Sequence, residues 1–466
     1  MRLLRLFLLV LLPGCWASCA LLRPAWGLDE SPGSDPTAVE GLRYLTTGEF
    51  DKAIESYLQA IEQTPANPYL WLDLGEAYRS AHRMPDAIAA FRRTLELSRD
   101  HELAQLGLAE CFRQLSNFDE ALRVLKKATL AHPNSPAPRF AQGRVYIELQ
   151  KYVEAQAALH AALELEPTNT AARVLLGSTF KSVAQLDEAL EEFDRALDQE
   201  PDNALARYLR ASIYADRNDI ERALPDAGRV VALEPGNTRA RFLLASILVR
   251  NGQCDSGAEH LEKVIAAEPD NTESVSLLAR AYQCAGRGVE AAEIRRRFAE
   301  LAKHDQTERE SRVQADHLVR EAGDHAREGR PNEALELLRQ ALARDSSNGG
   351  AYTQLAKVLY SAGRFEVAHE AVILALKHSP YRSDALYVLG RILIEQGNLA
   401  GARDALLQTT LINPLDAEAL FFLAQVYLEL GDDTSGVATL RKSLELEPDN
   451  TSYARALAQA VPSSNP

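Results

Sequence analysis

The stretch Trp71-Leu72-Asp73-Leu74-Gly75-Glu76-Ala77-Tyr78, followed by Ala87 and Phe91, decides the fold of this chain. Its apolar and small residues recur every three or four positions, which places them on one face of an α-helix. Small residues such as Gly75 and Ala87 let two antiparallel helices approach closely. The large side chains of Tyr78 and Phe91 would fill the space beside that contact. The stretch therefore predicts a helix, a short turn and a second helix packed against the first.

Small residues repeat along the chain with a period of 34. One column is Ala53, Ala87, Ala121, Ala155, Ala189, Ala223, Gly257 and Ala291, and after a step of 43 it continues as Ala334, Ala368, Ala402 and Gly436. One helical hairpin cannot bury its apolar face alone, so each unit must stack on its neighbours. The 466 residues therefore predict an all-α fold, an α-solenoid of twelve hairpins, rather than two or three globular domains.

These residues resemble the tetratricopeptide repeat family, and the resemblance covers about residues 34–450. It implies a right-handed superhelix in which the first helix of each hairpin lines a concave groove that holds a segment of another protein. The predicted array runs over 34–305 for repeats 1–8 and over 315–450 for repeats 9–12. Residues 451–466 are expected to form a capping helix and a tail.

Residues 306–314 are an insertion between the two parts of the array. No glycine or proline occurs between Gly288 and Gly323, which favours a helical insertion. Nine residues at 100° each add two and a half helical turns, so a continuous helix would offset the two parts. A longer loop within one unbroken superhelix is the alternative.

Residues 1–27 are predicted to be a signal peptide, and residues 28–36 a polar linker. Two arginines precede the apolar run Leu6–Leu12, which is much shorter than the roughly 20 residues that a spanning helix needs. Leu12-Pro13-Gly14-Cys15 also resembles a bacterial lipoprotein signal, so a lipidated or uncleaved leader is the alternative. We expect an exported protein, in the periplasm or outside the cell, that contacts a membrane only through this leader.

Motifs that carry chemistry are absent from the sequence. It contains no HExxH, GxxxxGK[ST], GxGxxG or GxSxG pattern. His317 and His325 share a helix face but lie about 12 Å apart, too far for one metal ion. We therefore expect no catalytic residue, no metal and no cofactor. An enzyme whose site is dispersed among the repeats is an alternative that no motif supports.

The net charge of −15 argues against a nucleic-acid partner, because a polyphosphate would be repelled on average. Loss of the leader with its three arginines would lower the charge to −18.

Cys254 and Cys284 are a candidate disulfide. Cys254 falls at the turn of unit seven, and Cys284 ends the first helix of unit eight, so stacking could bring them together. An exported chain would permit the bond. Two free cysteines are the alternative. Cys111 is expected in the core, because it lies beside Phe112 of an aromatic column that recurs every 34 residues, as in Tyr44, Tyr78 and Phe112.

The family register assigns positions two, five, nine, twelve and thirteen of each unit to the groove. The candidate protein-binding residues on these positions are Tyr69, Glu76, Arg79, Arg113, Phe140, Arg144, Lys181, Tyr208, Phe242, Arg250, Arg280, Lys357, Tyr360, Tyr387, Arg391 and Phe421. Arginine and tyrosine are enriched at interface anchors, so we expect a partner segment, peptide or helical, with acidic and apolar residues. Ion pairs within the array are the alternative role of these arginines.

Together these features predict a non-enzymatic scaffold or adaptor that binds partner proteins, in the assembly of a bacterial envelope or secretion complex. A membrane-anchored scaffold of the same kind is the alternative. The chaperone-tail clamp of the family needs Lys at position five and Asn at position nine, and none of the twelve units has this pair.

Overall fold

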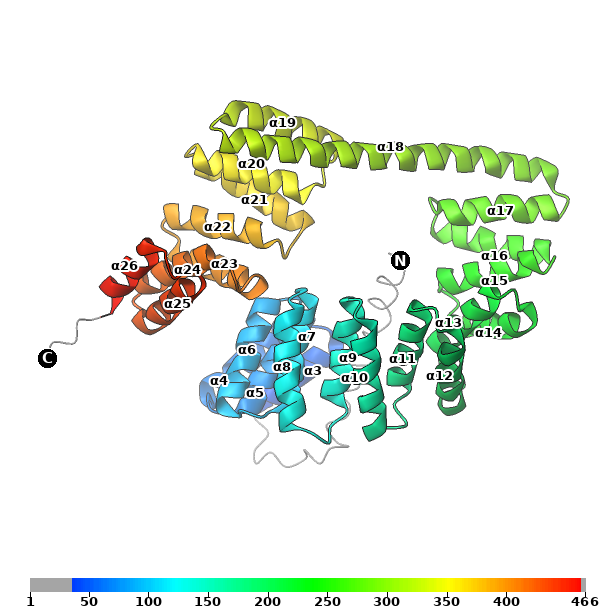
Figure 1. Cartoon of the computed structure of the whole chain (residues 1–466), viewed down its shortest axis with the longest axis horizontal. Coiled ribbons are helices and arrows are strands. Elements are labelled where there is room, and N and C mark those ends of the chain that lie inside the picture. Colours follow the sequence, from blue (N-terminus) through cyan, green and yellow to red (C-terminus); the bar gives the residue numbers. More distant parts are fainter. Residues whose placement is uncertain (1–35, 462–466) are drawn as a thin grey trace. The chain divides into compact units, whose positions relative to one another are not determined.

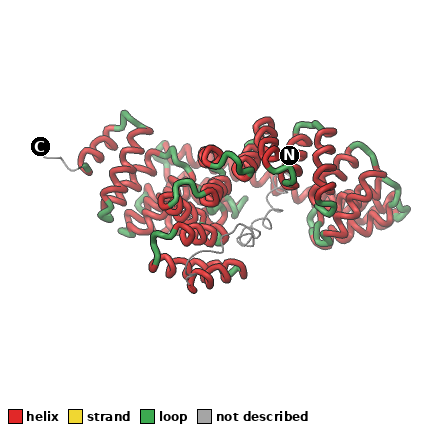
Figure 2. Tube along the Cα trace, turned by 90° about the horizontal axis from the view of Figure 1, so that it is seen from below, coloured by secondary structure: helices red, strands yellow, loops and turns green. Residues whose placement is uncertain are grey.

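The computed structural model describes residues 36–461, which form 24 α-helices, α3 to α26, and no strand (Figure 1). Short turns and loops join the helices (Figure 2). The predicted leader, nearly all of the predicted linker and the last five residues of the tail lie outside the described residues. The described chain forms two compact units: residues up to Lys303 without 115–117, and residues from His304 on together with 115–117.

The first unit is a stack of helical hairpins. The first helices of its hairpins are α3 (Pro36–Thr47), α5 (Pro68–Ser80), α7 (Glu102–Gln114), α9 (Ala137–Glu148), α11 (Thr170–Ser182), α13 (Ala204–Asp216), α15 (Thr238–Arg250) and α17 (Thr272–Cys284). The second helices are α4 (Phe50–Gln63), α6 (Met84–Leu97), α8 (Phe118–Ala131), α10 (Tyr152–Leu165), α12 (Leu186–Gln199), α14 (Ile220–Leu233), α16 (Cys254–Ala267) and the beginning of α18 (Gly288–Arg327).

The second unit repeats the same arrangement. Its first helices are the end of α18, α20 (Gly349–Ser361), α22 (Ser383–Glu395) and α24 (Ala417–Glu429). Its second helices are α19 (Pro331–Arg344), α21 (Phe365–His378), α23 (Leu399–Ile412) and α25 (Asp433–Leu446), and α26 (Thr451–Ala460) packs against α25. Helix α18 thus belongs to two hairpins.

The turn inside each hairpin contains one residue in the left-handed backbone region. Glycine takes this position in seven hairpins, for example Gly252 at φ 78°, and a non-glycine residue takes it in five, for example Ala184 at φ 63°. These twelve positions recur every 34 residues, with one step of 43, and they mark twelve hairpins. Asparagine caps many first helices; the Asn203 side chain accepts a hydrogen bond from the backbone N–H of Ala206 at 3.0 Å.

Close contacts between helices explain why small residues occur on the first helices. Phe91 of α6 is fully buried and lies against the backbones of Gly75 in α5 and Gly107 in α7. A Cβ atom added at either glycine would come within 2.6 Å of the Phe91 ring. Each large second-helix residue therefore fills a space that small first-helix residues leave open.

Helix α18 is continuous over its 40 residues, and residues 306–314 lie in its interior rather than in a loop. Phe298 and Leu301, in its early part, pack against the buried apolar side chains around Tyr282 of α17. Its later part, from Ala315, packs against α19 and α20. Between these parts most side chains are exposed and pair along the helix, as Arg312 does with Glu308. No helix within residues 36–461 is long and apolar enough to cross a membrane.

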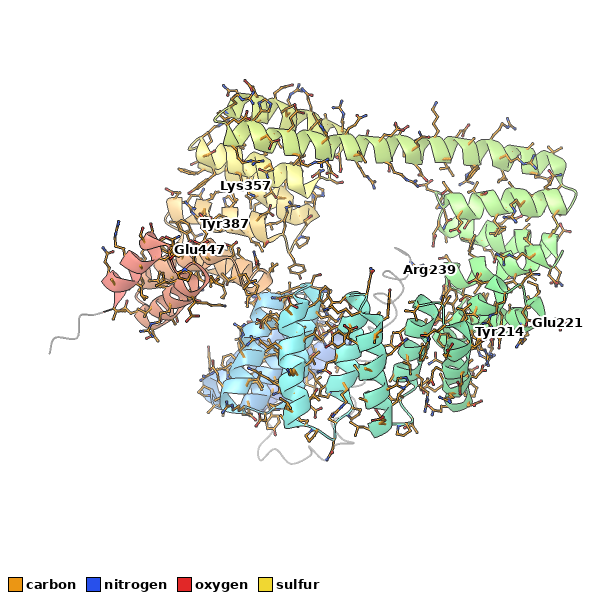
Figure 3. All side chains as sticks on the ribbon, in the orientation of Figure 1. Tyr214, Glu221, Arg239, Lys357, Tyr387 and Glu447 are labelled. Atoms are coloured by element: carbon orange, nitrogen blue, oxygen red, sulfur yellow. A yellow bond between two sulfur atoms is a disulfide. The ribbon has the colours of Figure 1, made fainter. Side chains whose placement is uncertain are left out.

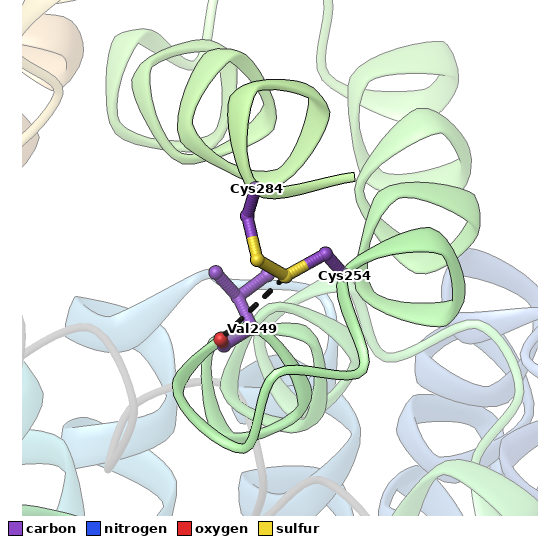
Figure 4. The surroundings of a disulfide bond; sticks show 3 residues. All are labelled: Val249, Cys254 and Cys284. Carbon is purple, nitrogen blue, oxygen red and sulfur yellow. Dashed lines mark hydrogen bonds between the residues drawn. A yellow bond between two sulfur atoms is a disulfide. The ribbon is translucent and has the colours of Figure 1, made fainter. Parts of the chain in front are cut away.

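A disulfide joins Cys254 to Cys284, with their Cα atoms 5.8 Å apart (Figure 4). Cys254 is the first residue of α16 and Cys284 is the last residue of α17, so the bond links two successive hairpins. The Sγ atom of Cys254 also lies 3.9 Å from the carbonyl oxygen of Val249. Cys111 in α7 is a free cysteine, fully buried in the core.

Candidate protein-binding surface

The first helices form a continuous row in each unit. In the first unit α3 contacts α5, α5 contacts α7, and the series continues to α17; in the second unit α20 contacts α22 and α22 contacts α24. We call the side chains of these helices at positions two, five, nine, twelve and thirteen of each repeat the inner-row surface. All sixteen candidate binding residues lie on these helices.

The sixteen residues differ in their exposure. Tyr69, Arg250 and Arg280 are exposed, and Arg113 is buried. The other twelve are partly buried: Glu76, Arg79, Phe140, Arg144, Lys181, Tyr208, Phe242, Lys357, Tyr360, Tyr387, Arg391 and Phe421. Three groups of these residues have distinct surroundings: one on α5, α7 and α9, one on α11, α13 and α15, and one in the second unit.

An ion-pair ladder lies on α5, α7 and α9, with pairs inside α5, inside α7 and between α7 and α9. It consists of three arginines and three glutamates: Glu76, Arg79, Glu110, Arg113, Arg144 and Glu148. Arg79 and Arg113 each pair with the glutamate three residues earlier at 2.6 Å, and Arg113 also pairs with Glu148 on α9. Arg144 reaches back to Glu110 at 3.4 Å.

Glu110 is the centre of this ladder. Burial acts to raise the pKa of its carboxyl, but Arg113 and Arg144 outweigh burial and hold this pKa at about 2. Conversely, burial acts to lower the pKa of Arg113, while Glu110 and Glu148 raise it above its usual range. The charges of Arg79, Arg113 and Arg144 are therefore balanced by carboxylates of the chain itself.

Lys181 on α11 is in a different situation. Its ammonium group donates a hydrogen bond to the hydroxyl of Ser212 on α13, and no carboxylate of the described residues lies within ion-pair distance. Burial lowers the pKa of Lys181, and the more distant charge of Asp216 offsets this effect only in part. Arg250 on α15 donates to the carbonyl oxygen of Ala215 at 2.8 Å, so its charge also faces a neutral partner.

Two aromatic side chains of the candidate set lie on α13 and α15. Tyr208 on α13 and Phe242 on α15 occupy position five of successive repeats, and both pack against the hydrophobic core while part of each ring stays exposed. The pKa of the Tyr208 hydroxyl is raised, mainly because the group is largely buried. Packing against the core therefore fixes the position of each ring, and the exposed part of the ring is accessible to a partner.

In the second unit Arg391 on α22 is enclosed by aromatic rings. Its guanidinium carbon lies 3.7 Å from the ring centre of Phe422, and its nitrogens donate to the hydroxyls of Tyr387 at 2.8 Å and Tyr360 at 3.0 Å. The carboxylate of Glu418 is 3.8 Å away. Burial raises the pKa of Tyr387.

The rest of the second-unit set lies nearby. Lys357 on α20 pairs with Asp384 at 3.4 Å, close to Tyr387 on the neighbouring helix α22 (Figure 3). Phe421 stacks on Tyr453 of α26, with ring centres 4.7 Å apart. Sequence reasoning missed Phe422 and Tyr453, because the first occupies position six and the second lies beyond the last repeat. It also missed Glu148 as the partner of Arg113, although Glu148 occupies position thirteen.

Stacked two-helix repeats with a row of first helices define the class of helical-repeat scaffolds. Models of the tetratricopeptide repeat match residues 39–102, 353–413 and 387–452, and a second set matches 78–142, 146–213, 214–280 and 325–374. These matches cover more than half of the sequence, so the chain belongs to the tetratricopeptide repeat family. Members of this family bind other proteins or peptides. No curated protein matches the sequence.

Several solved structures are similar to this chain. The APC/C hetero-tetramer Cut9–Hcn1 matches with 16% identity and a TM-score of 0.42 over 95% of this chain and 98% of that one. A tetratricopeptide repeat protein from Parabacteroides merdae matches with 19% identity and a TM-score of 0.42, over 53% of this chain and 97% of that one. YrrB, described as having an unusual peptide-binding site, matches with 25% identity and a TM-score of 0.33, over 40% of this chain and 96% of that one.

Proposed function

We propose that this protein is an exported, non-enzymatic scaffold or adaptor that holds a segment of a partner protein on its inner-row surface. The observation that carries the proposal is the series of partly exposed aromatic and cationic side chains on successive first helices, including Phe140, Lys181, Tyr208, Phe242 and Arg250. Aromatic residues and arginine supply most of the binding energy at protein interfaces. Their positions are set by a packed core, so little ordering accompanies binding.

The partner segment is expected to carry acidic and apolar residues. Exposed ring area favours apolar side chains, and cations without a carboxylate partner favour acidic ones. The net charge of −15 opposes a nucleic-acid partner. The role we propose is the assembly of an envelope or secretion complex in a bacterium.

Export is supported by two independent features. The amino-terminal residues match the layout of a signal peptide, and Cys254 is bonded to Cys284, a linkage that persists in oxidising compartments. Mass spectrometry of the protein from fractionated cells tests this. A mature chain beginning after Ala20 or Gly27 agrees with the proposal, and a lipid on Cys15 would establish the membrane-anchored form. An intact Met1 with reduced cysteines would contradict export.

Partner capture tests the binding surface. The double variant Tyr208→Leu, Phe242→Leu removes two rings but keeps apolar packing, and we expect it to lose the proteins that co-purify with the native chain. Val153→Ser is the matched control, because Val153 is exposed on a second helix. Equal recovery of each partner with the double variant, the control and the native chain would refute the proposed surface.

A further inference from the structure

The inner-row surface of α11, α13, α15 and α17 is locally cationic. Its charged side chains are Lys181, Arg239, Arg250 and Arg280 against only Asp216 and Glu273. The whole chain has the opposite balance, with 51 basic and 66 acidic residues. A cationic surface on an acidic protein attracts an anionic ligand and orients it towards that surface.

Lys181 and Arg250 differ from the arginines of the ion-pair ladder. Arg79, Arg113 and Arg144 already pair with carboxylates, so an incoming acidic group would have to displace an internal partner. Lys181 has a serine hydroxyl and Arg250 a backbone carbonyl oxygen as hydrogen-bond partners. A carboxylate brought to these two cations gains charge-assisted hydrogen bonds without breaking an ion pair.

These two cations lie next to the two partly exposed rings, because both donate hydrogen bonds to α13, the helix that carries Tyr208, and Arg250 shares α15 with Phe242. Tyr208 precedes Ser212 by one turn on α13, and Ser212 accepts the hydrogen bond from Lys181. Phe242 precedes Arg250 by about two turns on α15. The cations are near the carboxyl ends of α11 and α15, and the rings are nearer the amino ends of α13 and α15.

We propose that Lys181 and Arg250 form a recognition subsite for an acidic side chain of the partner segment, with Tyr208 and Phe242 contacting an adjacent apolar side chain. This subsite rests on the proposed protein-binding function and gives it a location and a specificity. The occupant is a peptide segment rather than a nucleic acid, since apolar contact area and only a few cations are offered within an acidic chain.

Random twelve-residue peptides displayed on phage and selected on the full-length protein supply the probe. The selected peptides are synthesised with a fluorescent label, and their dissociation constants are measured by anisotropy. We expect Asp or Glu beside Leu, Ile or Phe in these peptides. Lys181→Met, Arg250→Gln should weaken binding about tenfold or more. The control, Lys263→Gln, removes an exposed charge on α16 and should leave the dissociation constant unchanged.

Thermal unfolding separates recognition from folding. Lys181→Met replaces a partly buried cation that has no carboxylate partner within residues 36–461, so the thermal midpoint of the variant should equal or exceed that of the native chain while its affinity for the peptides falls. Selected peptides rich in basic or neutral residues would overturn the subsite. Acidic peptides that bind the Lys181→Met, Arg250→Gln variant as tightly as the native chain would also overturn it. Displacement of the peptides by an equally charged oligonucleotide at equal concentration would also overturn it.

The two proposals fail in different ways. Peptides that lose affinity with Tyr208→Leu, Phe242→Leu but not with Lys181→Met, Arg250→Gln would overturn the subsite and leave the proposed function in place. Selection of no peptide, or of peptides insensitive to both double variants, would overturn the subsite and the inner-row surface together.

Discussion

Individual residues of this chain are constrained by what lies directly opposite them. Phe91 is enclosed by Gly75 and Gly107, and Glu110 is enclosed by Arg113 and Arg144. In the first case the neighbours must have no side chain, and in the second they must carry a positive charge. Both constraints can be tested by single substitutions.

Gly107→Ala should destabilise the first unit by about 1–3 kcal/mol, because the new methyl group would overlap the Phe91 ring in a packed core. Gly228→Ala is the matched control, since nothing lies within 4 Å of its added Cβ in helix α14. There the same change should stabilise by up to about 1 kcal/mol through helix propensity. Chemical denaturation measures both; equal shifts in the same direction would contradict the packing argument.

Glu110 should make the stability of the first unit depend on pH in the acid range. Its pKa is about 2 in the fold, below the ordinary value of 4.5, so its ionised form stabilises the fold fully above pH 4.5. That stabilisation is lost as the pH falls from about 4.5 to about 2. The difference in thermal midpoint between the native chain and Glu110→Gln should therefore be large at pH 7 and shrink below pH 4. A difference in thermal midpoint that stays constant with pH would show that Glu110 does not make stability depend on pH.

Helices of this chain are stabilised mainly by their neighbours, and two elements depart from the repeating pattern. The disulfide adds a covalent link between α16 and α17, next to Val249 of α15. Helix α18 extends through a segment, about 303–314, where few side chains are buried. The disulfide-linked helices α16 and α17 should be more stable than packing alone would make them. The middle of α18 should be less stable than the helices that pack within the repeats.

The disulfide should stabilise the hairpins around it. Replacing Cys254 and Cys284 by alanine should lower local stability by about 2–4 kcal/mol, because the bond restricts the unfolded chain. Hydrogen exchange should rise in α16 and α17 and stay unchanged in α5 and α6. A reducing agent should have the same effect on the native chain and none on the double variant; protection that survives both treatments would rule out this role.

The middle of α18 should be sensitive to loss of a backbone hydrogen bond. Glu310→Pro should interrupt the helix, at a cost of about 3 kcal/mol, and expose residues 303–314 to proteases. Glu310→Ala removes the same charge, keeps the helix and is the control. Limited proteolysis with mass spectrometry locates the cuts. Protection of this segment in the proline variant would mean that contacts other than helical hydrogen bonds stabilise it.

At the scale of the whole molecule, charge is unevenly distributed. The chain carries −15 overall, yet the inner-row surface from α11 to α17 has four cations and two carboxylates. Ligand association should therefore depend on ionic strength. Raising NaCl from about 50 to about 300 mM should weaken binding of an acidic selected peptide several-fold, because the Debye length falls below 10 Å. The Lys181→Met, Arg250→Gln variant should show a weaker dependence, and equal salt dependence would place the electrostatic contribution elsewhere.

Sequence patterns predicted the helical repeats and the twelve-hairpin count because the residues that specify a hairpin are local. Small and aromatic residues at fixed spacing, together with a turn residue such as Gly252, act within one unit and recur in the next. The candidate binding residues were also placed on the first helices by this register. Their surroundings could not be predicted, because each depends on side chains one repeat away, as Arg113 depends on Glu148 and Arg391 on Phe422.

The sequence by itself determined the repeat, the helical class and the row on which the candidate residues lie, since helical periodicity and side-chain size are properties of short segments. Only the tertiary structure decided which cations have carboxylate partners. Arg79 pairs with Glu76 of its own helix, and Arg113 and Arg144 pair with glutamates across α7 and α9. Within residues 36–461, by contrast, Lys181 and Arg250 have neutral hydrogen-bond partners. The physical reason is that an ion pair requires two side chains within about 4 Å, and stacking of adjacent repeats sets that distance.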